Sequence, residues 1–102
     1  MELAIEGNEE KITISLKGEI KSETCDNLRQ AVLEVAGSAA PKVLEINLGE
    51  VSFIDTSGLG VLVGLRAHLK KNGTQLVVSE PQPKVHRVFE LTQLSKLFGL
   101  DT

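Results

Sequence analysis

The chain has 102 residues, 41% hydrophobic and 25% charged, which is enough for one domain with a single core and too short for two. A net charge of −3 and an aromatic content of only 3% argue against nucleic acid or an anionic membrane surface as the partner. Cys25 is the only cysteine, so no internal disulfide can form, and there is neither a signal-peptide pattern nor an apolar run of about 18 residues; we expect a cytoplasmic protein that does not insert into membranes.

The first part of the chain is predicted to form a β-hairpin. Leu3 and Ile5 alternate with polar residues before the polar turn Gly7-Asn-Glu-Glu10, and the same alternation returns over residues 12–16. A period of two is typical of strands that bury one face. The chain is therefore expected to begin with two antiparallel strands.

A helix is predicted next, from Ser22 or Thr24 to about Ala36. Ser and Thr are both N-cap types, and Gly37 is placed for a C-terminal cap. Apolar residues recur at three- and four-residue spacing along this helix: Cys25, Leu28, Val32, and Val35 or Ala36. Because no His or metal-ligand spacing accompanies it, the cysteine is expected to be a core residue rather than a reactive thiol.

Strands and helices alternate over the rest of the chain. Residues 43–48 are predicted to form a central strand covered on both faces. Residues 51–54 form a strand that leads into a helix ending near Asn72-Gly73, and residues 75–79 form a short buried strand. Pro83 opens a further helix. The last apolar residues form a short helix, or a helix and a strand: Leu94, Leu97, Phe98 and Leu100.

This order predicts an α/β fold in one domain over residues 1–102. After the initial β-hairpin, each strand is followed by a helix, as in a small mixed β-sheet flanked by helices. In such sheets, sites tend to gather at the carboxyl end of a central strand. The end of the strand at residue 54 is such a place.

Three polar residues and a glycine stand where this strand gives way to its helix. The side-chain oxygens of Asp55, Thr56 and Ser57 can accept hydrogen bonds from N–H groups that the first helical turn leaves unpaired. Gly58 permits a tight turn beside them. The same N–H groups and the helix dipole stabilise an anion. This joint is therefore predicted to start the helix and to form a binding site for a phosphate or another anion, called the anion seat below.

The helix that follows has a predicted core face and a predicted flank. The core face consists of apolar residues: Val61, Leu62, Leu65 and Leu69. Leu59, Val63 and Arg66 lie to one side, either as an exposed docking strip for a partner or as residues packed under a neighbouring element. Gly60 and Gly64 would allow close approach to the sheet or to a partner.

The stretch Val51-Ser-Phe-Ile-Asp-Thr-Ser-Gly-Leu-Gly-Val-Leu-Val-Gly64 resembles the signature of the STAS domain family, specifically its stand-alone bacterial anti-sigma factor antagonists. Three other segments are similar to matching parts of the family: Lys17-Gly-Glu-Ile20, Lys71-Asn-Gly-Thr74 and Val85-His-Arg-Val-Phe-Glu-Leu-Thr-Gln-Leu94. The resemblance therefore covers nearly the whole chain. It implies a mixed sheet with helices on one side.

The resemblance also implies a non-enzymatic switch in signal transduction and transcription regulation. The unphosphorylated domain would bind an anti-sigma factor serine/threonine kinase and so release a sigma factor. Phosphorylation of the hydroxyl residue after the motif Asp would end that binding, and a protein phosphatase would reset the switch. Thr56 holds this position, where the family more often has Ser, and Ser57 is the alternative acceptor. ATP would belong to the partner, so no cofactor is expected.

Functions of other classes are also considered. One alternative is a STAS subunit that docks on a transporter ATPase, or a partner-switching regulator that does not act on a sigma factor. Another is an enzyme or ligand binder that uses the anion seat, although no acid–base pair accompanies it. His68 and His86 share no metal-ligand spacing, and Gly58-Leu-Gly60 is too short for a dinucleotide loop. We therefore expect neither catalysis nor a metal.

Overall fold

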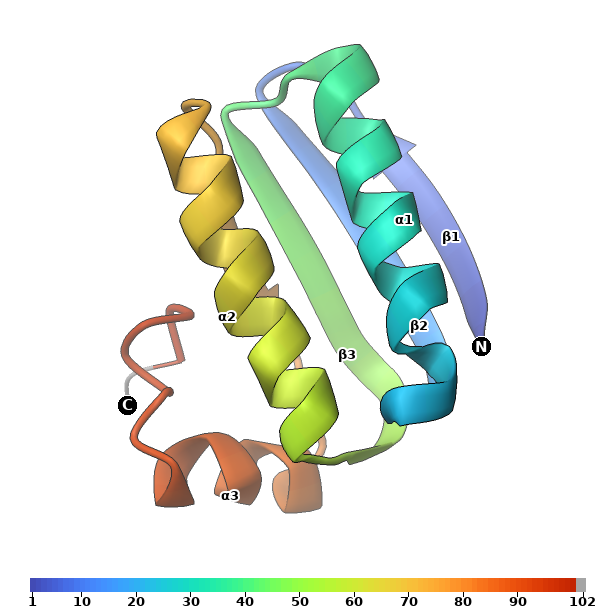
Figure 1. Cartoon of the computed structure of the whole chain (residues 1–102), viewed down its shortest axis with the longest axis vertical. Coiled ribbons are helices and arrows are strands. Elements are labelled where there is room, and N and C mark those ends of the chain that lie inside the picture. Colours follow the sequence, from blue (N-terminus) through green and yellow to red (C-terminus); the bar gives the residue numbers. More distant parts are fainter. Residues whose placement is uncertain (101–102) are drawn as a thin grey trace.

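In the computed structural model, which describes residues 1–100, four strands form one mixed sheet in the order β1-β2-β3-β4 (Figure 1). β1 (Glu2–Gly7) pairs antiparallel with β2 (Lys11–Ile20) through the expected hairpin. β3 (Val43–Ile54) pairs parallel with β2, and β4 (Gln75–Ser79) pairs parallel with β3. The predicted α/β fold with an initial hairpin is confirmed.

Two helices lie side by side on one face of this sheet (Figure 1). α1 (Ser22–Ala39) connects β2 to β3, and α2 (Thr56–Lys71) connects β3 to β4. Crossovers between parallel strands are almost always right-handed, so two successive crossovers in the same direction put both helices on the same face. α1 and α2 consequently run parallel and begin at the same end of the sheet. The shorter α3 (Pro83–Leu91) lies across that end, against β3.

The core fills the space between the sheet and the helices. Every second residue over 12–16 of β2 and 44–48 of β3 points into it, as the period of two predicts, and beyond these ranges the alternation is interrupted where the register between the two strands shifts. Fully buried side chains come from both layers and include Ile14, Leu16, Leu28, Val32, Leu44, Ile46, Leu48, Leu62, Leu76 and Phe89. Within residues 1–100, no helix is both long enough and apolar enough to cross a membrane.

The opposite face of the sheet carries polar residues instead of a second layer of helices. The Glu45 carboxylate accepts hydrogen bonds from Thr13 on β2 and Ser79 on β4, and it pairs with the Lys11 ammonium at 2.7 Å. These contacts, chiefly those with Lys11 and then Ser79, hold the pKa of Glu45 below its ordinary value. The prediction that residues 43–48 are covered on both faces is therefore wrong, because both crossovers put their helices on the same side.

The boundaries of α1 also differ from the prediction. Its N-cap is Lys21, whose N–H donates to the Thr24 hydroxyl at 3.0 Å, so neither Ser22 nor Thr24 is the cap. The helix passes through Gly37 and ends at Ala39, followed by Ala40 with φ 43° and ψ 54°. Proline disfavours the helical conformation in the residue before it, so Pro41 stops the helix and Gly37 does not.

The segment after α3 forms turns, so the predicted short helix or strand there is wrong. Phe98 is nevertheless fully buried, with its ring in edge-to-face contact with Phe89 at 5.6 Å. Its backbone oxygen accepts from the Val78 N–H at 3.0 Å. The segment therefore satisfies part of the outer edge of β4 and closes one end of the core.

Candidate functional site

The candidate site is the joint between β3 and α2. Asp55 is the N-cap of α2, and its Oδ1 accepts from the Gly58 N–H at 2.8 Å. The Asp55 backbone oxygen accepts from Leu59 N–H at 3.0 Å, and its own N–H donates to the Ile20 oxygen at 3.1 Å. These three bonds tie the joint both to its helix and to the end of β2. Of the three predicted cap types, Asp55 takes the role.

Gly58 brings the first turn of α2 directly against the sheet. A Cβ at this position would lie 2.6 Å from Ile20 Cγ2, 2.9 Å from the Ile20 oxygen and 3.0 Å from Ile54 Cγ1. No side chain fits there without displacing its neighbours. The residue is part of the helix, so its role is close approach to the sheet rather than the predicted tight turn.

Thr56 and Ser57 follow the cap as the first two residues of α2, and both are exposed. Their side chains leave the helix about 100° apart. Ser57 lines a groove between α1 and α2, whereas Thr56 is not among the residues that line it. The joint thus offers two accessible hydroxyls on a fixed backbone, and each faces a different part of the surface.

The predicted anion seat is partly filled by the protein itself. The Asp55 carboxylate already accepts from the Gly58 N–H and brings a negative charge to the start of the helix. A free anion would have to displace it or lie against it. A phosphoryl group attached to an exposed hydroxyl has no such requirement, because it can project outward from the first turn. A free anion therefore competes with Asp55 for the start of the helix, whereas the two hydroxyls are accessible.

Loss of the cap should destabilise the protein without blocking its folding. Asp55→Ala is expected to lower the free energy of unfolding by about 1 kcal/mol, since the Gly58 N–H loses its partner. Asp55→Ser should retain most of the stability, because a serine hydroxyl is also an effective cap. Urea denaturation of the two variants measures the difference. Equal losses in both would show that the carboxylate acts through its charge rather than as a hydrogen-bond acceptor.

The predicted docking strip on α2 is only partly present. Leu59 is 5% exposed and belongs to the core, so its assignment to an exposed strip is wrong. The close approach at Gly58 draws this first turn into the sheet, and Leu59 lies only about 60° around the helix from Leu62. Val63 is 37% exposed, and Arg66 is half-buried with its Nε donating to the Leu97 oxygen at 3.2 Å.

The rest of α2 follows the predicted core face with two differences. Leu62, Leu65 and Leu69 are buried, while Val61 is only partly buried at the edge of the core. Gly60 and Gly64 do not approach the sheet as one reading predicted. Both are exposed, and nothing lies within 4 Å of a Cβ placed on either. They line the groove between α1 and α2 and keep it open.

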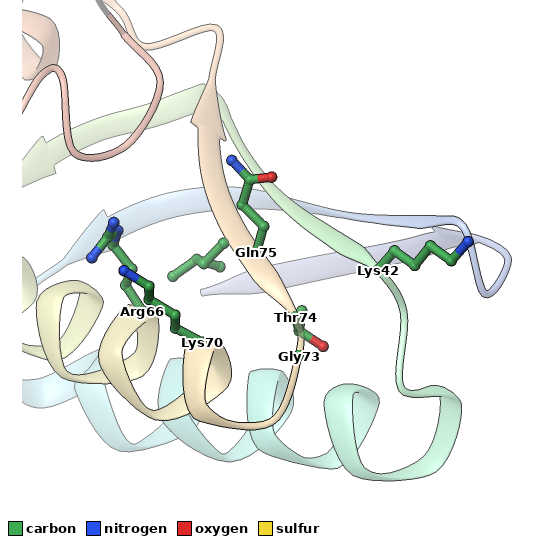
Figure 2. Close-up of a pocket in the computed structure, with 7 residues that line it drawn as sticks. Lys42, Arg66, Lys70, Gly73, Thr74 and Gln75 are labelled. Atoms are coloured by element: carbon green, nitrogen blue, oxygen red, sulfur yellow. The ribbon is translucent and has the colours of Figure 1, made fainter.

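A second groove lies between α2 and β4 and is shown in Figure 2. Its volume is about 530 Å³. Arg66 and Lys70 project into it from successive turns of α2, with Gln75 of β4 nearby, while Lys42 points away at the far end. No acidic side chain within residues 1–100 lines this groove. Lys70 is about 21 Å along the helix from Thr56, so this basic groove is separate from the joint.

The remaining candidate residues do not form a chemical centre. Cys25 is buried, and this burial, together with the nearby Asp55 charge, raises the pKa of its thiol, so the neutral form is favoured. His68 is exposed on α2 and His86 lies on α3. Across residues 1–100, no three His, Cys, Asp or Glu side chains are grouped to hold a metal ion.

Comparison with known proteins gives consistent matches along the whole chain. The family model of the STAS domain matches residues 2–102. An anti-sigma-B factor antagonist of Listeria monocytogenes is 37% identical over 103 residues, covering 98% of this chain and 90% of the relative. A protein of the same description from Bacillus subtilis is 31% identical, covering 94% of this chain and 86% of the relative.

Solved structures share the fold. The crystal structure of an anti-sigma factor antagonist from Mycobacterium paratuberculosis matches with a TM-score of 0.78 and 31% identity, covering 95% of this chain and 81% of that one. The anti-sigma factor antagonist SpoIIAA in its unphosphorylated form matches with a TM-score of 0.79 and 24% identity, covering 93% of this chain and 84% of that one.

Proposed function

The chain belongs to the STAS domain family, and from this premise we propose that it acts as an anti-sigma factor antagonist controlled by phosphorylation. In its unphosphorylated form it binds an anti-sigma factor serine/threonine kinase, which then releases a sigma factor. Relatives at 37% and 31% identity carry the name anti-sigma-B factor antagonist over nearly their full length. The observation that carries the proposal is a pair of exposed hydroxyls at the rigidly held start of α2. A protein with this role acts in the cytoplasm and takes part in transcription regulation.

The covalent step takes place in the active site of the partner kinase. The Thr56 or Ser57 hydroxyl oxygen attacks the γ-phosphorus of ATP, and a new O–P bond forms. The bond from that phosphorus to the bridging oxygen breaks, ADP leaves, and the hydroxyl proton passes to a base on the kinase. This chain is the substrate and supplies the nucleophile only. It therefore acts without a cofactor and without enzymatic activity of its own.

The phosphoryl group changes the surface while the fold stays in place. It adds about −1.5 to −2 charge units and three acceptor oxygens next to Asp55. A partner surface that fits the bare hydroxyl then meets extra volume and a charge that must lose its water on binding. The bonds from the Asp55 backbone to Ile20 and Leu59 do not involve either hydroxyl. Partner binding is lost without unfolding, and a protein phosphatase restores it.

The test is to incubate the chain with the purified partner kinase and ATP and to map the modified residue by mass spectrometry. We expect Thr56→Ala to abolish phosphorylation, whereas Ser22→Ala should not affect it. Ser22 is the matched control, because it is an exposed hydroxyl at the first position of α1. Phosphorylation should weaken binding of the partner at least about tenfold.

Two outcomes bear on the acceptor and on the function separately. Loss of labelling in Ser57→Ala, with Thr56→Ala unaffected, would move the acceptor to Ser57 and leave the switch intact. Unchanged labelling after removal of both hydroxyls, or partner binding that is the same before and after phosphorylation, would reject the switch. A chain without either hydroxyl that still functions and co-purifies with a transporter ATPase would support the alternative of a docking subunit.

A further inference from the structure

Arg29 of α1 faces the same groove as Ser57. The groove lies between α1 and α2 and has a volume of about 490 Å³, which is ample for a phosphoryl group. Arg29 and His68 are the basic side chains that line it, and within residues 1–100 no carboxylate lines it. Thr56, one residue earlier on α2, is exposed but does not line the groove. The two neighbouring hydroxyls therefore differ in the charge that each one faces.

The arrangement of the helices explains why Arg29 comes near the start of α2. α1 and α2 run parallel from the same end of the sheet (Figure 1). Arg29 Nη1 donates to Asp26 Oδ1 at 2.6 Å, and Asp26 lies nearly one turn earlier on α1. This bond draws the guanidinium toward the N-terminal end of α1, which lies at the same end of the sheet as the start of α2. Gly60 lines the same groove, and a Cβ placed on it would meet nothing within 4 Å, so this part of the groove is open.

We propose that Arg29 is the internal counter-ion of a phosphoryl group on Ser57 and does not serve one on Thr56. The proposal rests on the proposed function only in that the partner kinase delivers the group. A phosphoryl group on Ser57 is then paired across the groove and joins α2 to α1. A phosphoryl group on Thr56 stays turned to the partner. The two phosphorylated states differ chemically although their acceptors are adjacent.

The existing partner of Arg29 does not prevent this pairing. The side chains of Arg29 and Asp26 are 47% and 92% exposed, and ion pairs this exposed contribute little. A phosphate dianion carries more charge than a carboxylate and accepts two parallel hydrogen bonds from a guanidinium. The other charged groups at this end of the fold are Asp26 and Glu23 on α1, Asp55 before α2, and Lys21 before α1, whose ammonium already pairs with Glu19 at 2.8 Å. The carboxylates disfavour the dianion, and Lys21 does not line the groove, so Arg29 is the cation that shares the groove with Ser57 at this end.

The experiment installs phosphoserine by genetic encoding at position 57 in one chain and at position 56 in a second. The second pKa of the phosphate, about 6 for a free phosphoserine, is followed by ³¹P NMR titration in each chain with Arg29 intact and with Arg29→Gln. We expect Arg29→Gln to raise this pKa by about 0.5 unit at position 57, because the dianion loses its counter-ion. Position 56 should change by less than about 0.1 unit. Arg29→Lys should give an intermediate shift at position 57, because it keeps the charge without the planar guanidinium.

Two results would overturn the proposal: no change at position 57, or equal changes at positions 56 and 57. Equal changes would mean that Arg29 acts only as a distant charge. Thermal unfolding of each chain checks that the fold is retained. Because the phosphate is installed without a kinase, the titration does not depend on the proposed function. If the partner kinase modifies neither hydroxyl, the proposed function fails while the titration still decides the role of Arg29.

Discussion

Phe98→Ala is expected to lower the free energy of unfolding by about 3–5 kcal/mol, the range for removing a buried aromatic side chain. Phe98 is 0% exposed, and its ring makes the edge-to-face contact with Phe89. Its backbone also accepts the hydrogen bond from Val78 at the outer edge of β4. The substitution leaves a cavity and frees the segment that covers this edge. Urea denaturation monitored by circular dichroism measures the loss.

Leu97→Ala is the matched control for this prediction. Leu97 is the adjacent residue but is 36% exposed, so its truncation should cost less than about 1 kcal/mol. The backbone oxygen that accepts from Arg66 is retained in this variant. A loss in Phe98→Ala no larger than in Leu97→Ala would show that the Phe98 ring does not anchor the segment. The difference between them therefore tests whether the segment is anchored by the Phe98 ring.

The sequence predicts the order of elements well because hydrophobic period is a local property. The alternation over residues 12–16 and the spacing of Leu28 and Val32 specify a strand and a helix, whatever lies opposite them. Which face of the sheet receives the helices is decided by crossover handedness, not by the residues of one strand. The four apolar residues among residues 43–48, with few interruptions, therefore suggested two covered faces. Glu45 is the residue that could have corrected this, since a carboxylate mid-strand needs polar partners.

Glycines and the C-terminal segment show a second limit of prediction from sequence. The sequence predicted a tight turn at Gly58 and close approach at Gly60 and Gly64, yet of these three only Gly58 meets another element. The difference depends on what each residue faces, which local pattern does not contain. Phe98 is similar, because a buried side chain does not require a regular element around it. The contact between the Phe98 and Phe89 rings depends on how the turns that follow α3 pass over the end of the core.

At the candidate site, sequence identifies the hydroxyls but not their surroundings. The run Asp55-Thr56-Ser57 marks the joint by cap chemistry alone, and the structure assigns the cap to Asp55. Arg29 gives no such signal. It is far from Ser57 in sequence and meets the same groove only because α1 and α2 lie in parallel on one face. Differences between adjacent hydroxyls thus arise from tertiary structure.

Gly58→Ala is expected to lower the free energy of unfolding by about 2 kcal/mol, although alanine is the better helix former. The new methyl group would lie 2.6 Å from Ile20 Cγ2 and 2.9 Å from the Ile20 oxygen, so the first turn of α2 must move away from the sheet. Gly60→Ala is the control. Its methyl group meets nothing within 4 Å, so the helix propensity alone should raise stability by up to about 1 kcal/mol. Urea denaturation of both variants gives opposite signs if close approach is the role of Gly58.

The same substitution tests whether the position of the hydroxyls matters for the switch. Moving the first turn displaces Thr56 and Ser57 together, and it strains the Asp55 bonds to Ile20 and Gly58 that hold the joint. We therefore expect Gly58→Ala to weaken binding of the unphosphorylated chain to its partner kinase at least about tenfold at a temperature where the variant is still folded. Gly60→Ala, which leaves the joint in place, should bind as the parent chain does. Full binding by Gly58→Ala would mean that the partner contacts α2 beyond its first turn. The hydroxyls would then lie at the rim of the interface, and a phosphoryl group on either of them would have little effect on partner binding.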